Sequence, residues 1–358
     1  MPAFPDDVLF VIVKELKQLL REDISRHDRY SGRQPKFAPY AGVSRQWNAI
    51  IERETFRHIR VSSTDLLHEG CGGEAPDQGL VTTARFKEMM NRDPVRRRKI
   101  LRHINFVASY SFSVYSTMGR LDAGRTTNDE HFSRSVHEFW KMLEHWELPL
   151  SLTFVQAPIS KGDWSKESPA WLNLVGDSLP RLRSVTSFSV DDELVVWPSS
   201  LMTIVESLTH LTNAKLILND DIEDPKLRRR WREDLGHGIS QISITCRDFY
   251  ARLTDRSHGF EEQPAVAPGG PDTFCINLRT LSTHLRHLHL EQARISAALF
   301  WPGADEKNQA SLPSWPHLET LLIQLEPVDS FGRFYADPTP EEVACNASHN
   351  ELRPWDPI

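Results

Sequence analysis

Three closely spaced histidines, His284, His287 and His289, are the residues whose type and spacing most directly suggest chemistry, because neutral imidazole is a common metal ligand. His287 and His289 alternate with Leu288 and Leu290, however, and a strand places alternate residues on opposite faces. Polar residues are usual at the outward positions of such a strand. We therefore expect outward-facing strand residues here, with a metal-binding pair as the alternative.

Motifs of common catalytic sites are absent from the sequence. It contains no G-x-S-x-G nucleophile turn, no G-x-x-x-x-G-K-[ST] phosphate loop, no H-E-x-x-H zinc helix and no G-x-G-x-x-G after a strand. The four cysteines lie far apart without a C-x-x-C pair, which argues against a zinc module and against a disulfide scaffold. We predict no catalytic residue, no metal and no cofactor. An enzyme whose site is assembled from scattered residues is left open.

Two basic runs, at residues 96–99 and 228–232, have the composition of an anion contact or a nuclear-import patch. Acidic residues flank both, among them Asp93, Glu233 and Asp234, so we expect solvated helix faces with ion pairs, and nuclear import is the alternative. The formal net charge of the whole chain is −7, which gives no reason to expect nucleic acid as a partner.

The elements that would position a binding surface begin at the N-terminus, where two amphipathic helical patterns flank a polar stretch at residues 21–36. Pro5 suits the first position of a helix, and the aspartates after it suit the helix macrodipole. The apolar residues at three- and four-residue steps are Val8, Leu9, Ile12, Leu16, Leu19 and Leu20 in the first pattern, and Tyr40, Val43, Trp47, Ile50 and Ile51 in the second. So short a segment cannot bury both faces, and another surface must cover the remainder.

These residues resemble the F-box, whose pattern runs roughly L-P-x-E-[IVL]-[IL]-x-x-I and, after a gap, V-[CS]-[KR]-x-W-x-x-[IL]. The chain has FPDDVLFVI and VSRQWNAI, with Phe4 where the family usually has Leu and a longer link between the helices. The resemblance implies docking on the adaptor subunit of an SCF-type cullin ubiquitin ligase, while the rest of the chain holds a protein substrate. The adaptor-binding residues that it implies are Pro5, Val8, Leu9, Ile12, Leu16, Val43, Trp47 and Ile50.

A second pattern, with apolar residues at i, i+3 and i+5, recurs after residue 56. Its clearest instances begin at Phe56, Leu101, Ile239, Leu285 and Leu318. The last two positions share one face of a strand, as in the L-x-x-L-x-L units of leucine-rich repeats. Helical patterns at 82–90, 132–146 and 199–208 fall between the strands. We predict an α/β fold class, with N-terminal all-α F-box helices followed by an irregular leucine-rich-repeat-like solenoid.

The predicted domains are an F-box module at 1–56, a leucine-rich-repeat-like substrate-recruitment domain at 57–330 and a polar, Pro-rich tail at 331–358. The order of these pieces is similar to that in a group of filamentous-fungal F-box proteins. Polar stretches at 68–79, 109–128, 255–272 and 303–316 are expected to lie outside the core.

The expected partners are the SCF adaptor, through it a cullin, and a protein substrate, with no nucleic acid and no membrane. No apolar run is long enough to span a bilayer and no signal peptide is recognised, so we expect a cytoplasmic or nuclear location. The main alternative is a repeat-type interaction scaffold with no ligase role, in which Leu9 and Ile12 would be buried inside the protein.

Overall fold

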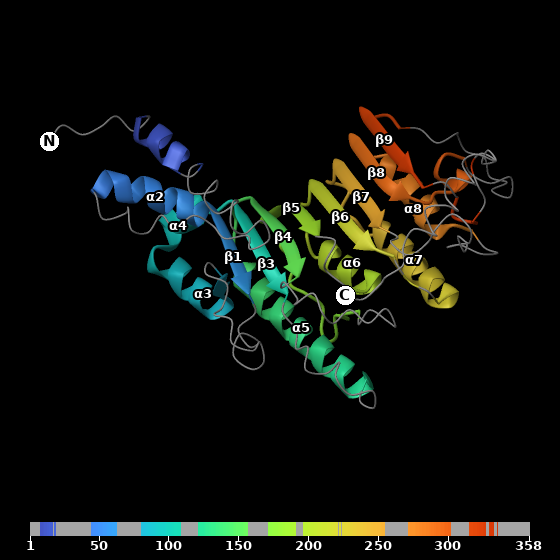
Figure 1. Ribbon diagram of the computed structural model, residues 1–358, viewed down its shortest axis with the longest axis horizontal. Coiled ribbons are helices and arrows are strands. Elements are labelled where there is room, and N and C mark those ends of the chain that lie inside the picture. Colours follow the sequence, from blue (N-terminus) through green and yellow to red (C-terminus); the bar gives the residue numbers. More distant parts are fainter. Residues whose placement is uncertain are drawn as a thin grey trace, which may run out of the picture. The chain divides into compact units, whose positions relative to one another are not determined.

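In the computed structural model, parallel strands alternate with helices, which confirms the predicted α/β class (Figure 1). The structure describes residues 8–16, 18, 44–62, 80–108, 121–156, 171–190, 196–220, 222, 224–254, 271–301, 315–326, 329–332 and 335. The chain divides into two compact units, Met1–Ala157 and Pro158–Ile358.

The first unit combines a parallel sheet with helices. Its strands have the order β2-β1-β3-β4 and are β1 (His58–Ser62), β2 (Leu80–Thr82), β3 (His103–Ala108) and β4 (Leu150–Gln156). Its helices are a helix at residues 8–16, α2 (Arg45–Arg57), α3 (Thr83–Arg92), α4 (Pro94–Ile100) and α5 (Leu121–Leu143). The prediction that residues 109–128 lie outside the core is wrong at Asn128, which is buried near the start of α5.

The register of this sheet aligns the buried residues of adjacent strands. One row holds Ile59, Ile104 and Leu152, and the next holds Val61, Phe106 and Phe154. The Phe106 ring lies 4.6 Å from that of Phe139 on α5 and 5.2 Å from that of Phe154, measured between centroids. Aromatic contacts of this kind fix α5 against the strands.

The second unit has five strands that pair in chain order, all parallel: β5 (Val185–Val190), β6 (Asn213–Asn219), β7 (Asp248–Thr254), β8 (His287–Ala293) and β9 (Thr320–Leu325). Its helices are α6 (Pro198–Glu206), α7 (Pro225–Ile239), α8 (Thr273–Ser282) and the 3-10 turn η3 (Ala297–Leu299). Apolar residues again share rows, and one row holds Phe188, Ala214, Phe249, Leu288 and Leu321.

Two glycines let α7 pack closely against both neighbouring helices. A Cβ atom at Gly236 would lie 2.6 Å from the backbone nitrogen of Phe274 on α8, and one at Gly238 would lie 1.9 Å from Cγ of Met202 on α6. Glycine in a helix interior costs roughly 1 kcal/mol relative to alanine. Close packing of α7 between its neighbours offsets that cost.

One predicted strand is wrong. The pattern that begins at Ile239 does not form a strand, because Ile239 ends α7 and Ile244 is exposed in the turn that follows. The strand lies at β7, where Phe249, Ala251 and Leu253 are buried.

Candidate functional site

The helix at residues 8–16 has one buried side and one exposed apolar side. Leu9 and Val13 are buried, and Val13 forms a small core with Ile51 of α2. Leu16, Trp47 and Ile50 pack against that core. Four apolar residues of the same helix are 40 to 55 % exposed: Val8, Phe10, Val11 and Ile12.

The start of α2 positions its apolar side against the first helix. Ser44 adopts an extended conformation, and its Oγ accepts a hydrogen bond of 3.1 Å from the Trp47 backbone N–H, which is a standard N-cap. The cap sets the helix phase that places Trp47, Ile50 and Ile51 at i, i+3 and i+4 on one side. The indole Nε1 of Trp47 is buried without a hydrogen-bond partner in the described part of the chain.

The residues predicted to bind the adaptor therefore differ in how far they are buried. Val8 and Ile12 are exposed, and Leu9 is buried. Leu16, Trp47 and Ile50 pack in the contact between the two helices. Pro5 and Val43 lie outside the described residues. The sequence prediction omitted Phe10 and Val11, although both are large apolar residues next to the predicted positions.

A second candidate surface lies on the second unit, on the strand face opposite its buried apolar rows. We call it the open strand face and define it by Lys215, Asp248, Tyr250, Arg252, His287, His289 and Glu291. The predicted outward position of the histidines on β8 is confirmed, because Leu288 and Leu290 are buried while His287 and His289 are not. In the described residues, no group of three or more His, Cys, Asp or Glu side chains could hold a metal ion.

Side chains of the open strand face contact one another across the strands. The ammonium of Lys215 lies 5.1 Å from the Tyr250 ring centroid, and the Tyr250 and His289 rings meet edge to face at 4.7 Å. The Tyr250 hydroxyl donates a hydrogen bond to Glu291, whose carboxylate also lies 3.8 Å from Nε of Arg252. Burial, together with the hydrogen bond to Glu291, raises the pKa of Tyr250 to about 12, so its hydroxyl stays protonated at neutral pH.

Toward the N-terminal ends of the strands, the Asp248 carboxylate contacts side chains of both neighbouring strands. Asn213 on β6 donates a side-chain hydrogen bond to Asp248, and Nε2 of His287 on β8 lies 3.8 Å from the same carboxylate. The side chains of Asp248 and His287 are 39 and 48 % exposed. The open strand face thus presents donors, acceptors and both charge signs on three adjacent strands.

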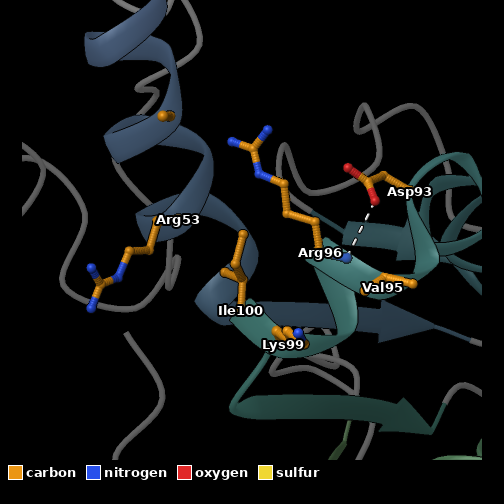
Figure 2. Close-up of a pocket in the computed structure, with 7 residues that line it drawn as sticks. Arg53, Asp93, Val95, Arg96, Lys99 and Ile100 are labelled. Carbon is orange, nitrogen blue, oxygen red and sulfur yellow. Dashed lines mark hydrogen bonds between the residues drawn. The ribbon is translucent and has the colours of Figure 1, made fainter.

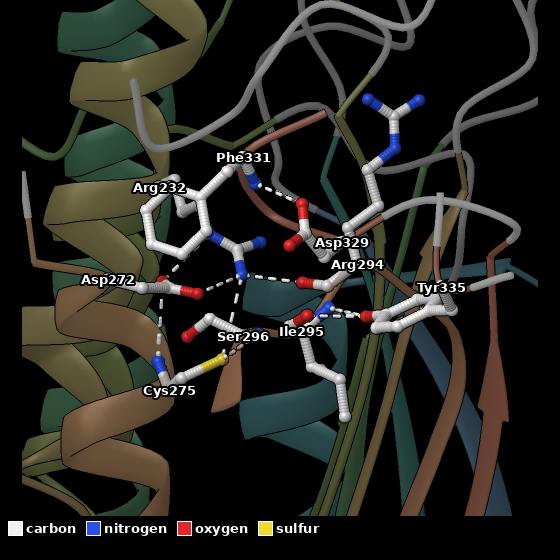
Figure 3. Close-up of polar contacts among 9 residues, drawn as sticks. All are labelled: Arg232, Asp272, Cys275, Arg294, Ile295, Ser296, Asp329, Phe331 and Tyr335. Atoms are coloured by element: carbon white, nitrogen blue, oxygen red, sulfur yellow. Dashed lines mark hydrogen bonds and ion pairs between the residues drawn. The ribbon is translucent and has the colours of Figure 1, made fainter. Parts of the chain in front are cut away.

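A third group of titratable side chains is buried where α7, α8, the segment after β8 and residues 329–332 meet (Figure 3). The Arg232 guanidinium binds both carboxylate oxygens of Asp272, at 3.1 and 3.0 Å, and donates a 2.6 Å hydrogen bond to the Arg294 carbonyl. Asp272 also caps α8 by accepting from the Cys275 N–H. The Tyr335 hydroxyl contacts the Ile295 backbone, so this residue of the predicted tail is held against the segment after β8.

The ion pair between Arg232 and Asp272 shifts the pKa values of this buried group. Burial alone would raise the pKa of Asp272, but the Arg232 charge and hydrogen bonds outweigh it and lower the pKa to about 2. Burial and the charge of Asp272 raise the pKa of Cys275 to about 12, so its thiol is neutral and a poor nucleophile. Arg232, Asp272 and Cys275 contact one another, and Arg232 and Cys275 also contact Arg294 and Ser296, so the group joins α7 and α8 to the segment after β8.

The predicted solvated face at residues 228–232 is wrong for two of its arginines. Arg228 and Arg232 are buried, together with Trp231. Arg229 lies 2.8 Å from Glu233 and Arg230 lies 4.0 Å from Asp234, as the flanking acids predicted.

None of the helices in the described part of the chain is long and apolar enough to cross a membrane. Comparison with known proteins adds no relative, since no family model, no curated protein and no solved structure matches the chain.

Proposed function

We propose that this chain is the substrate-recruiting subunit of an SCF-type cullin ubiquitin ligase. It binds the adaptor through the helix at residues 8–16 together with α2, and a protein substrate through the open strand face. The observation that carries the proposal is the exposed apolar side of the first helix, which comprises Val8, Phe10, Val11 and Ile12. Several large apolar side chains exposed on one helix are typical of a protein interface.

The opposite side of the same helix supports this assignment. Val13 and Leu16 pack with residues of α2, so the helix is held in place while its exposed side stays available. An amphipathic helix anchored in this way can be buried in an apolar groove of a partner. Complete burial of an exposed aliphatic side chain contributes about 1.5 to 3 kcal/mol, and a half-exposed one about half of that.

For the substrate domain we propose an irregular leucine-rich-repeat-like solenoid. Two features support it: β5 to β9 pair in chain order, and helices α6, α7 and α8 alternate with those strands along the chain. Repeats of this kind present a strand face as an extended binding surface. The proposed subunit has no catalytic residue and acts by raising the effective concentration of the target lysine near a ubiquitin thioester held elsewhere.

The buried position of Leu9 favours a second candidate function, a repeat-type interaction scaffold with no ligase role. In that case the N-terminal helices serve only to cover the end of the repeat domain. The exposed position of Ile12 favours the ligase, because a helix with a purely internal role would bury it.

Binding of purified adaptor to the full chain, measured by calorimetry, tests the proposal. We expect a Val11→Asp, Ile12→Asp variant to bind at least tenfold more weakly while its circular dichroism stays that of the wild type, because both side chains are exposed. Ile244→Asp, at an exposed apolar residue of the turn after α7, is the control and should bind normally. A folded wild type that does not bind the adaptor would reject the ligase role and favour the scaffold.

A further inference from the structure

A cleft of about 410 Å³ lies between α2 and α4 in the first unit (Figure 2). Ala49 and Arg53 line it from α2. From α4 and its cap, the lining residues are Asp93, Val95, Arg96, Lys99 and Ile100. The cleft therefore combines three cationic side chains and one carboxylate with an apolar part, and none of its lining residues belongs to the first helix.

The described segments around the cleft are strongly basic, although the whole chain is acidic. Residues 44–62 and 80–108 contain twelve lysines and arginines but only four aspartates and glutamates. The chain as a whole has a formal net charge of −7. A local excess of positive charge of this size attracts negatively charged partners and accelerates their association.

Contacts between α2 and α4 hold the walls of the cleft in place. The carboxylate of Glu52 on α2 lies 2.7 Å from the Arg96 guanidinium and 3.3 Å from that of Arg97. The Arg97 guanidinium also lies 4.6 Å from the Phe56 ring centroid and donates to the Met89 carbonyl. Because α2 and α4 are joined in this way, the cleft needs little rearrangement to accept a ligand.

Charge in the cleft is only partly neutralised. Asp93 accepts a 3.2 Å hydrogen bond from the Arg96 N–H and so caps α4, and Arg96 is paired with Glu52. Arg53 and Lys99 are exposed, and neither makes a hydrogen bond or ion pair in the part of the chain that the structure describes. Two cations next to an exposed Val95 are thus available to a ligand.

We infer that this cleft binds an acidic segment of a partner polypeptide. Carboxylates of that segment contact Arg53 and Lys99, and one of its apolar side chains packs on Val95 and Ile100. A polypeptide fits better than nucleic acid, because no lining residue is aromatic and base stacking needs an aromatic platform. This inference goes beyond the adaptor and substrate surfaces and does not depend on them.

Fluorescence anisotropy of the full chain tests this site, with a labelled peptide of alternating Asp and Glu around one Leu as the probe. At low ionic strength we expect an Arg53→Glu, Lys99→Glu variant to bind about tenfold more weakly, because two attractive contacts become repulsive. Val95→Ser should weaken binding about threefold by removing apolar contact.

The matched control is Arg85→Glu, Lys87→Glu, which reverses two exposed charges on α3 outside the cleft. Its net charge equals that of the cleft variant, and we expect less than a twofold change. An equal loss of peptide affinity in both variants would show that only the net charge of the chain matters, and would overturn the proposed site. Absence of peptide binding, or tighter binding of a single-stranded oligonucleotide or of anionic lipid vesicles, would overturn the polypeptide assignment.

Discussion

The two basic runs of this chain have similar compositions and opposite surroundings. The run at residues 96–99 forms most of α4, where no residue is buried, and its arginines reach across to Glu52 of α2. The run at residues 228–232 lies in α7, where Arg228 and Arg232 are buried and Arg229 and Arg230 pair with acids on the same helix. Local charge density therefore does not decide whether an arginine is buried.

The spacing of the apolar residues in a helix decides which of its arginines are buried. In α7, Trp231, Leu235 and Ile239 are four residues apart and define the buried side, which also takes in the arginines at 228 and 232. A buried arginine must then find a charged partner, and Asp272 provides it for Arg232. The short α4 has no such apolar series, so none of its cations is buried, and Lys99 among them is available to a ligand.

The largest effect is expected from Asp272→Ala in the buried group of Arg232, Asp272 and Cys275. Loss of the carboxylate leaves the Arg232 charge buried without its partner and should lower the free energy of unfolding by about 3 to 5 kcal/mol. Urea denaturation followed by circular dichroism measures it. The double variant Arg232→Met, Asp272→Leu removes both charges and should recover most of the loss. A single variant as stable as the wild type would show that the pair is dispensable.

Acid should weaken the same pair by a somewhat smaller amount. The pKa of Asp272 is lowered from an ordinary 3.8 to about 2, so its contribution is complete above the unfolded pKa and is lost as the pH falls from 4 to 2. That loss amounts to about 2 kcal/mol. Urea denaturation at a series of pH values measures it, and the charge-free double variant should show a flatter dependence over this window. If the free energy of unfolding fell equally with pH in the two proteins, the loss could not be assigned to Asp272.

A smaller effect is expected from Glu52→Gln at the cleft. Its carboxylate contacts Arg96 and Arg97 at partly exposed positions, so the substitution should cost about 1 kcal/mol in the free energy of unfolding. The same denaturation measurement applies.

Arg229→Ala is the substitution with which Glu52→Gln is compared. It removes an ion pair between two exposed residues of α7 and should lower the free energy of unfolding by at most about 0.5 kcal/mol. A cost at Glu52 as small as that at Arg229 would mean that α2 and α4 are held together by other contacts.

The repeating apolar pattern predicted much of the fold, since β1, β3, β8 and β9 lie where it placed them. The pattern predicted a strand at residues 239–244 instead of at β7. Ile239 is the last residue of helix α7, and the two isoleucines that follow it at the predicted spacing lie in a turn. The true strand has the small Ala251 at one buried position and charged residues between, which weakens its signal.

The sites were harder to predict than the strands. Arg232, Asp272 and Tyr335 lie far apart in sequence, and Asp272 ends a stretch expected outside the core. Only the folded chain brings them together. Phe10 and Val11 were missed for a different reason, because three- and four-residue spacing selects one side of a helix and gives no information on an apolar second side.

The chain-order pairing of β5 to β9 has a consequence for how the second unit is made. Each strand leaves the ribosome after the strand beside which it will lie, so every new strand finds its neighbour already present. Only one growing edge needs protection at any moment. When synthesis has passed β9, Leu321, Leu322 and Leu325 are still exposed on that last edge, which makes β9 the segment where nascent chains of this protein would first associate with a chaperone or with one another.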